Sequence, residues 1–129
     1  FRTGHPPERL RMLMPEQDFG LMLYDFAGVR IGRQHLSEVV PSKFFHYLEL
    51  GLPVLVSPEL QAVAALVRRH DLGLVVPRSR VSRLAALLHT HIRRYPAWIR
   101  NLESFRTRFS MSQQVAGLES WYQDLARIT

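Results

Sequence analysis

The sequence predicts an α/β protein built on a Rossmann-like open parallel sheet with helices on its faces. Three short apolar runs read as strands, at residues 18–24, 53–56 and 73–76. Stretches with helical periodicity separate them, and this alternation is typical of parallel strands joined by right-handed crossovers. The middle run is apolar without alternation, which indicates a strand that is covered on both faces. A length of 129 residues favours one domain with a modest core.

The first half of the chain alternates helix and strand signals. We expect a short helix over Pro6–Leu13, followed by a strand that ends at Tyr24. Residues 25–40 show no strong periodicity and carry two glycines, so we expect a long loop there. A helix over 42–50 follows, and its spacing predicts packing against the sheet by Phe44, Phe45, Tyr47 and Leu48.

Helix 42–50 has suitable boundary residues at both ends. Pro41 suits a helix entry, and the Ser42 hydroxyl can accept a backbone N–H as an N-cap. Gly51 is placed to end the helix, and Pro53 lies where a strand can begin. The sequence therefore predicts a helix start, a helix stop and a buried strand within sixteen residues.

The next helix and strand are predicted by periodicity. Glu59–His70 reads as an amphipathic helix whose inward positions are Leu60, Val63, Ala64, Leu66 and Val67. Pro77 ends the strand that follows.

The last third of the chain reads as helical. One face of the first helix gathers Val81, Leu84, Leu87, Leu88, His91 and Ile92. Ser79 or Ser82 is expected to cap this helix, and Pro96 to break it. Two closing helices are expected at about 97–108 and 111–127, with Ser110 as the cap between them.

Composition excludes several classes of protein. A hydrophobic content of 47% indicates a folded chain rather than a disordered one. No apolar run approaches the ~20 residues of a membrane-spanning helix, and the first residues lack the apolar core of a signal peptide. The absence of cysteine excludes a disulfide scaffold and a thiolate metal site. These features predict a cytoplasmic protein.

The formal net charge of +6 favours an anionic partner such as a nucleotide diphosphate, a lipid headgroup or a nucleic acid. Sixteen of the seventeen basic residues are arginines, and the one lysine is Lys43. A helix that begins just outside a parallel strand presents free N–H groups and a partial positive charge to an anion. The start of helix 42–50 therefore predicts a phosphate-type site formed by the backbone at Pro41–Phe44 and by Lys43. The alternative is that Lys43 lies along the helix surface.

The order of these elements, together with PSKFFHYLELGLPVLVS at 41–57, resembles the C-terminal, donor-binding domain of GT-B glycosyltransferases of family four. The likeness covers nearly the whole chain, 1–129, including the helix and strand before the loop and the closing helices at 97–127. It implies half of such a domain, so that the upstream half and the acceptor domain lie outside these residues and this piece alone is inactive.

The resemblance also implies site residues. The family often carries two glutamates with seven residues between them, one near the donor sugar and one on the nucleotide ribose. The first position falls on Glu38 and the second on His46, so the expected ribose contact is a histidine here. Neutral imidazole offers one acceptor and one donor where a carboxylate accepts from two hydroxyls. Glu38 as a solvated acid and His46 as an ordinary helix histidine are the alternatives.

The implied reaction is transfer of a sugar, with retention, from a nucleotide diphosphate to a hydroxyl acceptor. The helix start would stabilise the departing diphosphate, and such enzymes generally need no bound metal ion. Tyr24, at a strand's carboxyl end, would lie on the crevice side; simple packing is its alternative. A non-catalytic GT-B-like domain for binding or assembly is the competing interpretation.

The arginines at 78, 80, 83, 93, 94, 100, 106 and 108 concentrate positive charge in the C-terminal helices. They indicate either a solvated face or peripheral contact with anionic lipid at the inner face of a membrane. Trp98 and Trp121 are expected to pack rather than to lie at that interface. A basic nucleic-acid-binding module ranks last, because no recognition motif is readable.

Overall fold

The computed structural model describes residues 17–26, 33–109 and 111–128. Its elements are β1 (Gly20–Met22), α2 (Arg33–Glu38), α3 (Ser42–Glu49), β2 (Val54–Val56), α4 (Gln61–His70), β3 (Gly73–Val75), α5 (Arg78–Val81), α6 (Leu84–His91), a 3-10 turn η1 (Ile92–Arg94), α7 (Tyr95–Arg108) and α8 (Met111–Ile128). The expected helix at Pro6–Leu13 and the expected cap at Ser110 lie outside the described residues.

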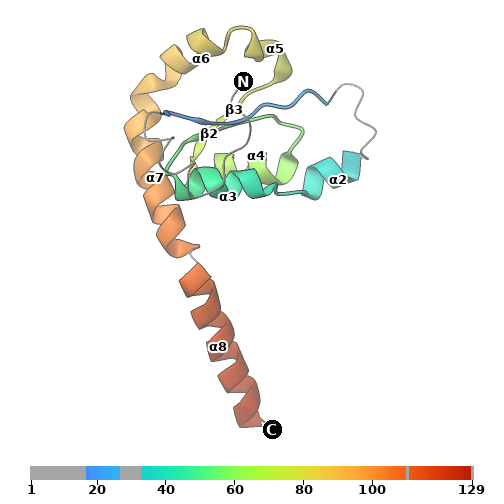
Figure 1. The fold of residues 1–129 in the computed structure, drawn as a ribbon, viewed down its shortest axis with the longest axis vertical. Helices are drawn as coiled ribbons and strands as arrows, with labels where there is room; N and C mark the ends of the chain where they lie inside the picture. Colours follow the sequence, from blue (N-terminus) through green and yellow to red (C-terminus); the bar gives the residue numbers. More distant parts are fainter. Residues whose placement is uncertain (1–16, 27–32, 110, 129) are drawn as a thin grey trace, which may run out of the picture.

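The three predicted strands form one parallel sheet in the order β1-β2-β3. Gly20 pairs with Val54, and Val54 pairs in turn with Gly73. Helices α3 and α4 lie below the sheet in Figure 1, and α5 and α6 form an arc above it. The fold is therefore a mixed α/β fold with a small open parallel sheet flanked by helices, as the sequence predicted.

The strands are shorter than the apolar runs that predicted them. After Met22 the ladder between β1 and β2 stops, because the Tyr24 N–H donates to the Ser57 hydroxyl at 3.0 Å instead of to a backbone carbonyl. All three residues of β2 are buried, and this confirms the expectation of a strand covered on both faces.

Helix α3 confirms one predicted boundary and corrects the other. Gly51 has a φ of 71°, and the N–H of Leu52 donates to the Tyr47 carbonyl, which closes the helix in a Schellman-type turn. The predicted Ser42 N-cap is wrong. Pro41 occupies the N-cap position with a φ of −62°, so Ser42 is already in the first helical turn and its hydroxyl makes no capping hydrogen bond.

The core forms where α3 and α4 meet the strands. Phe44 and Leu48 are buried on α3, and Val63, Ala64 and Val67 on α4, as the helical spacing predicted. The prediction for Phe45 is wrong, since 52% of its side chain is exposed. A helix that packs on one face of a sheet buries only one stripe, and Phe45 falls beside that stripe.

Residues 33–38 form helix α2, so the prediction of a loop over 25–40 is wrong for this part; residues 27–32 are not described. Helix α2 lies against α4. Its six residues are too few to show a periodicity, and short helices depend on tertiary packing such as this contact with α4.

The helix expected after Pro77 is divided into α5, α6 and η1. The predicted serine caps are wrong, because Pro77 and Arg83 hold the N-cap positions. Pro96 lies in the first turn of α7, where its missing N–H costs no helical hydrogen bond.

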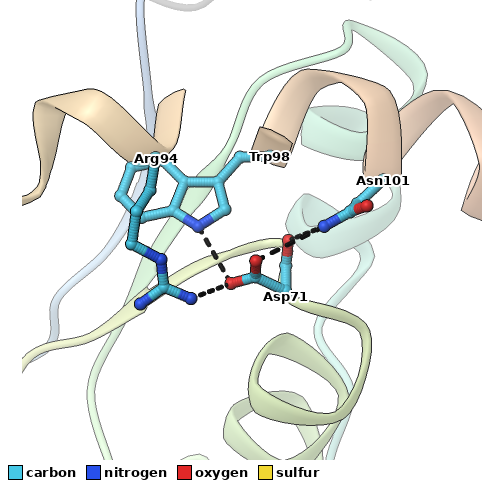
Figure 2. Close-up of polar contacts among 4 residues, drawn as sticks. All are labelled: Asp71, Arg94, Trp98 and Asn101. Atoms are coloured by element: carbon cyan, nitrogen blue, oxygen red, sulfur yellow. Dashed lines mark hydrogen bonds and ion pairs between the residues drawn. The ribbon is translucent and has the colours of Figure 1, made fainter. Parts of the chain in front are cut away.

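Helix α7 is held to the end of α4 by a polar cluster around Asp71, shown in Figure 2. Asp71 follows α4 with a φ of 49°, and its Oδ1 accepts from the Trp98 indole N–H at 3.0 Å and from Arg94 at 2.5 Å. The Asn101 amide donates to the Asp71 carbonyl at 3.0 Å. Trp98 is fully buried, as predicted, whereas Trp121 is 56% exposed and the packing predicted for it is wrong.

The imidazole of His70 lies edge-on to Phe105, with 4.9 Å between ring centroids, at the contact of α4 with α7. Burial in this contact lowers the pKa of His70 below its ordinary value of 6.5, and the charges of Arg69 and Arg108 lower it further.

We therefore expect the free energy of unfolding to fall as the pH drops below about 6.5. Between the lowered folded pKa and the unfolded pKa of His70, the unfolded state holds more protons, so acid favours unfolding. Urea unfolding at pH 7.5 and pH 5.5 measures this loss. His70→Gln should reduce the loss, and His89→Gln, at an exposed position on α6, should leave it unchanged. An identical loss in His70→Gln would contradict the assignment.

Candidate functional site

The three strands end at one edge of the sheet, here called the carboxyl edge, and polar residues follow each of them. Tyr24 and Asp25 come after β1, Ser57 comes directly after β2, and Arg78 begins α5 after β3. Helix α3 leads into the amino end of β2, so its own amino end lies at the carboxyl edge. In open parallel sheets this edge is where ligands bind.

Two of the predicted site residues meet at the carboxyl edge. The Lys43 ammonium lies 5.8 Å from the centroid of the Tyr24 ring, within the range of a cation–π contact. The Tyr24 backbone is fixed by the Ser57 hydroxyl, and Ser57 is only 5% exposed. The Tyr24 ring itself is 38% exposed, so it lines the surface rather than the core.

The first turn of α3 offers two free backbone donors. The Phe44 N–H donates to the Pro41 carbonyl at 2.9 Å, whereas the N–H groups of Ser42 and Lys43 have no backbone acceptor in the described chain. The Phe44 side chain is fully buried and points into the core cluster, so Phe44 offers the site no side chain. Proline lacks an N–H, and Pro41 therefore contributes only helix geometry.

Glu38 and His46 both have exposed side chains. His46 lies one turn after Lys43, away from the buried stripe of Phe44 and Leu48. Glu38 ends α2 rather than standing in a loop. Their roles toward a sugar and a ribose stay predictions.

The structure adds an ion pair that the sequence reasoning missed. The Arg78 guanidinium binds the Asp25 carboxylate through two contacts, of 2.7 and 3.0 Å. This pair joins the chain after β1 to the start of α5 at the carboxyl edge. The signal that pointed to Tyr24, a polar residue just beyond a strand, applies equally to Asp25 and Arg78.

Two surface hollows lie along α7, away from the carboxyl edge. The larger is lined by Arg100, Glu103, Ser104, Thr107, Arg108 and Gln113, and the smaller lies beside His70 and Phe109. Among the described residues, no three His, Asp or Glu side chains gather as metal ligands would. Within the same residues, no helix combines the length and the apolar character needed to cross a bilayer.

The comparisons with known proteins found no match: no protein-family model, no curated protein and no solved structure corresponds to this chain.

Proposed function

We propose that the carboxyl edge binds the diphosphate of a nucleotide-sugar donor, as part of a glycosyltransferase with a GT-B donor domain. The observation that supports this most directly is the start of α3, where two free N–H groups, the helix dipole and the Lys43 ammonium coincide beside Tyr24. Oriented N–H groups and a lysine are suited to bind phosphate oxygens.

In the proposed reaction the glycosyl group passes to a hydroxyl acceptor with retention, and the bond from the anomeric carbon to the diphosphate breaks. Negative charge grows on the departing diphosphate. Donors held in place by the fold stabilise that charge without reorganising, which is the role we assign to the first turn of α3 and to Lys43. His46 would hold one ribose hydroxyl, and Glu38 would lie near the sugar.

The order of the three parallel strands agrees with the second half of a Rossmann-like donor domain. The same proposal includes a separate acceptor-binding domain as the partner of this one. A second candidate is a non-catalytic GT-B-like binding or assembly domain, favoured by His46 in the place where the resemblance expects a glutamate. Turnover of a nucleotide sugar by a protein that contains this chain would eliminate it.

Lys43→Ala should weaken binding of UDP or GDP roughly tenfold, because a charged hydrogen bond contributes at least ~1.5 kcal/mol. Isothermal titration calorimetry with UDP, GDP and their sugars, on a protein that contains this chain together with the upstream half of the donor domain, measures the effect. Arg68→Ala is the matched control: it removes one exposed positive charge from the last turn of α4, far from the carboxyl edge. Failure to bind any nucleotide diphosphate, or an equal loss in the control, would refute the proposal.

A further inference from the structure

The segment that runs from β3 into the first half of α7 is rich in arginine and contains no acidic residue. Residues 72–102 contain six arginines and no aspartate or glutamate, although eleven acidic residues occur in the chain. The centre of this stretch is the arc of α5, α6 and η1, residues 78–94, which rises above the sheet in Figure 1 before joining α7. We call residues 78–94 the arginine arc.

Two of the five arginines in the arginine arc form ion pairs with acidic residues elsewhere in the fold. Arg78 binds Asp25, and Arg94 binds Asp71. The other three arginines of the arc, at 80, 83 and 93, are exposed and have no acidic partner among the residues that the structure describes. Ion pairs that stabilise the fold therefore explain the presence of Arg78 and Arg94. They do not explain the presence of Arg80, Arg83 and Arg93.

The arginine arc also exposes aliphatic side chains. None of its residues is fully buried, and Val81 and Ile92 are 41% and 50% exposed. Leu84, Leu87 and Leu88 are half-buried on α6. Helices that lie in a lipid interface combine lysine or arginine with apolar side chains. The arginine arc exposes side chains of both kinds.

We propose that the arginine arc binds an anionic lipid surface, with Arg80, Arg83 and Arg93 at the headgroups and Val81 and Ile92 entering the interface. Charge complementarity selects the partner: an acid-free arc attracts phosphate headgroups, and its arginines keep their charge at every physiological pH. Nucleic acid is the alternative anion, but residues 78–94 contain no phenylalanine, tyrosine or tryptophan on which a base could stack. The proposal does not depend on nucleotide binding at the carboxyl edge.

The test is sedimentation of this chain with vesicles of phosphatidylcholine, with and without about one third phosphatidylserine. The unaltered protein should bind the mixed vesicles only, and more weakly at high salt. The triple variant Arg80→Gln, Arg83→Gln and Arg93→Gln should lower the partition coefficient on the order of 100-fold, because each basic residue near the surface contributes roughly fivefold, or ~1 kcal/mol.

The matched control replaces three exposed arginines elsewhere, at positions 68, 69 and 127, by glutamine. It makes the same change in net charge and should retain most of the binding. Circular dichroism checks that both variants fold. The proposal is overturned if the protein does not bind the mixed vesicles, if both variants lose binding equally, or if the triple variant loses only affinity for a generic RNA or DNA duplex.

Discussion

Replacing Gly73 with alanine should strongly destabilise the sheet. Gly73 begins β3 with a φ of 150°, which side-chain-bearing residues rarely adopt. A Cβ at this position would lie 2.1 Å from the Val54 carbonyl oxygen and 2.6 Å from the Val54 nitrogen. Because both atoms belong to the adjacent strand, the clash is relieved only if β2 and β3 separate.

Separation of β2 from β3 would break the strand pairing that places the buried side chains of β2 in the core. Val54 and Val56 are fully buried, and the Val54 N–H donates to the Leu72 carbonyl at 2.9 Å next to Gly73. We expect a loss of more than about 4 kcal/mol in the free energy of unfolding, a large part of the usual total of ~5–15 kcal/mol. Urea unfolding followed by circular dichroism measures it.

Gly117→Ala is the matched control for Gly73→Ala. Gly117 lies within α8, and apart from the neighbouring backbone of this helix no described atom lies within 4 Å of the place that its Cβ would take. Alanine is favoured over glycine inside a helix by ~1 kcal/mol, so this variant should be at least as stable as the unaltered protein. A Gly73→Ala protein with normal stability would show that the strands are not paired as described.

Asp71→Ala should lower the free energy of unfolding by about 3 kcal/mol. The change leaves the indole N–H of the fully buried Trp98 without its acceptor and removes the ion pair with Arg94 (Figure 2). It also forces alanine into the left-handed region, at a φ of 49°, which costs roughly 1 kcal/mol more than for aspartate. Thermal unfolding should show a midpoint lower by on the order of 10 °C.

Asp71→Asn separates these causes. Asparagine tolerates the left-handed conformation and retains a side-chain acceptor for Trp98, so only the half-exposed ion pair is lost, with a cost of about 1 kcal/mol or less. Trp98→Phe removes the indole donor itself. If the orphaned N–H is the main cause, Asp71→Ala should cost clearly less in the Trp98→Phe background. Equal costs in both backgrounds would contradict this explanation.

Local signals in the sequence predicted much of the fold. Alternating periodicities predicted three strands and the helices between them, and the parallel sheet of the structure confirms them. Gly51 ends α3 as its position indicated. These features were readable because backbone geometry and burial of one helix stripe depend on near neighbours in the chain.

Contacts between distant residues decided the rest. The Ser57 hydroxyl, 33 residues from Tyr24, ends β1 early. Contact with α4 accompanies a helix at 33–38 where no periodicity was visible. Asp71 shows no special pattern in the sequence, yet it joins the end of α4 to Trp98, 27 residues onward.

For the candidate site, the sequence by itself determined the residue types: a helix start after Pro41, a single lysine and a tyrosine at a strand end. Only the tertiary structure decided that Lys43 meets Tyr24 and that Arg78 pairs with Asp25, whereas Arg80, Arg83 and Arg93 form no ion pair within the described residues. The physical reason is that strand pairing brings the ends of β1, β2 and β3 together, and no local pattern encodes the resulting distances between side chains.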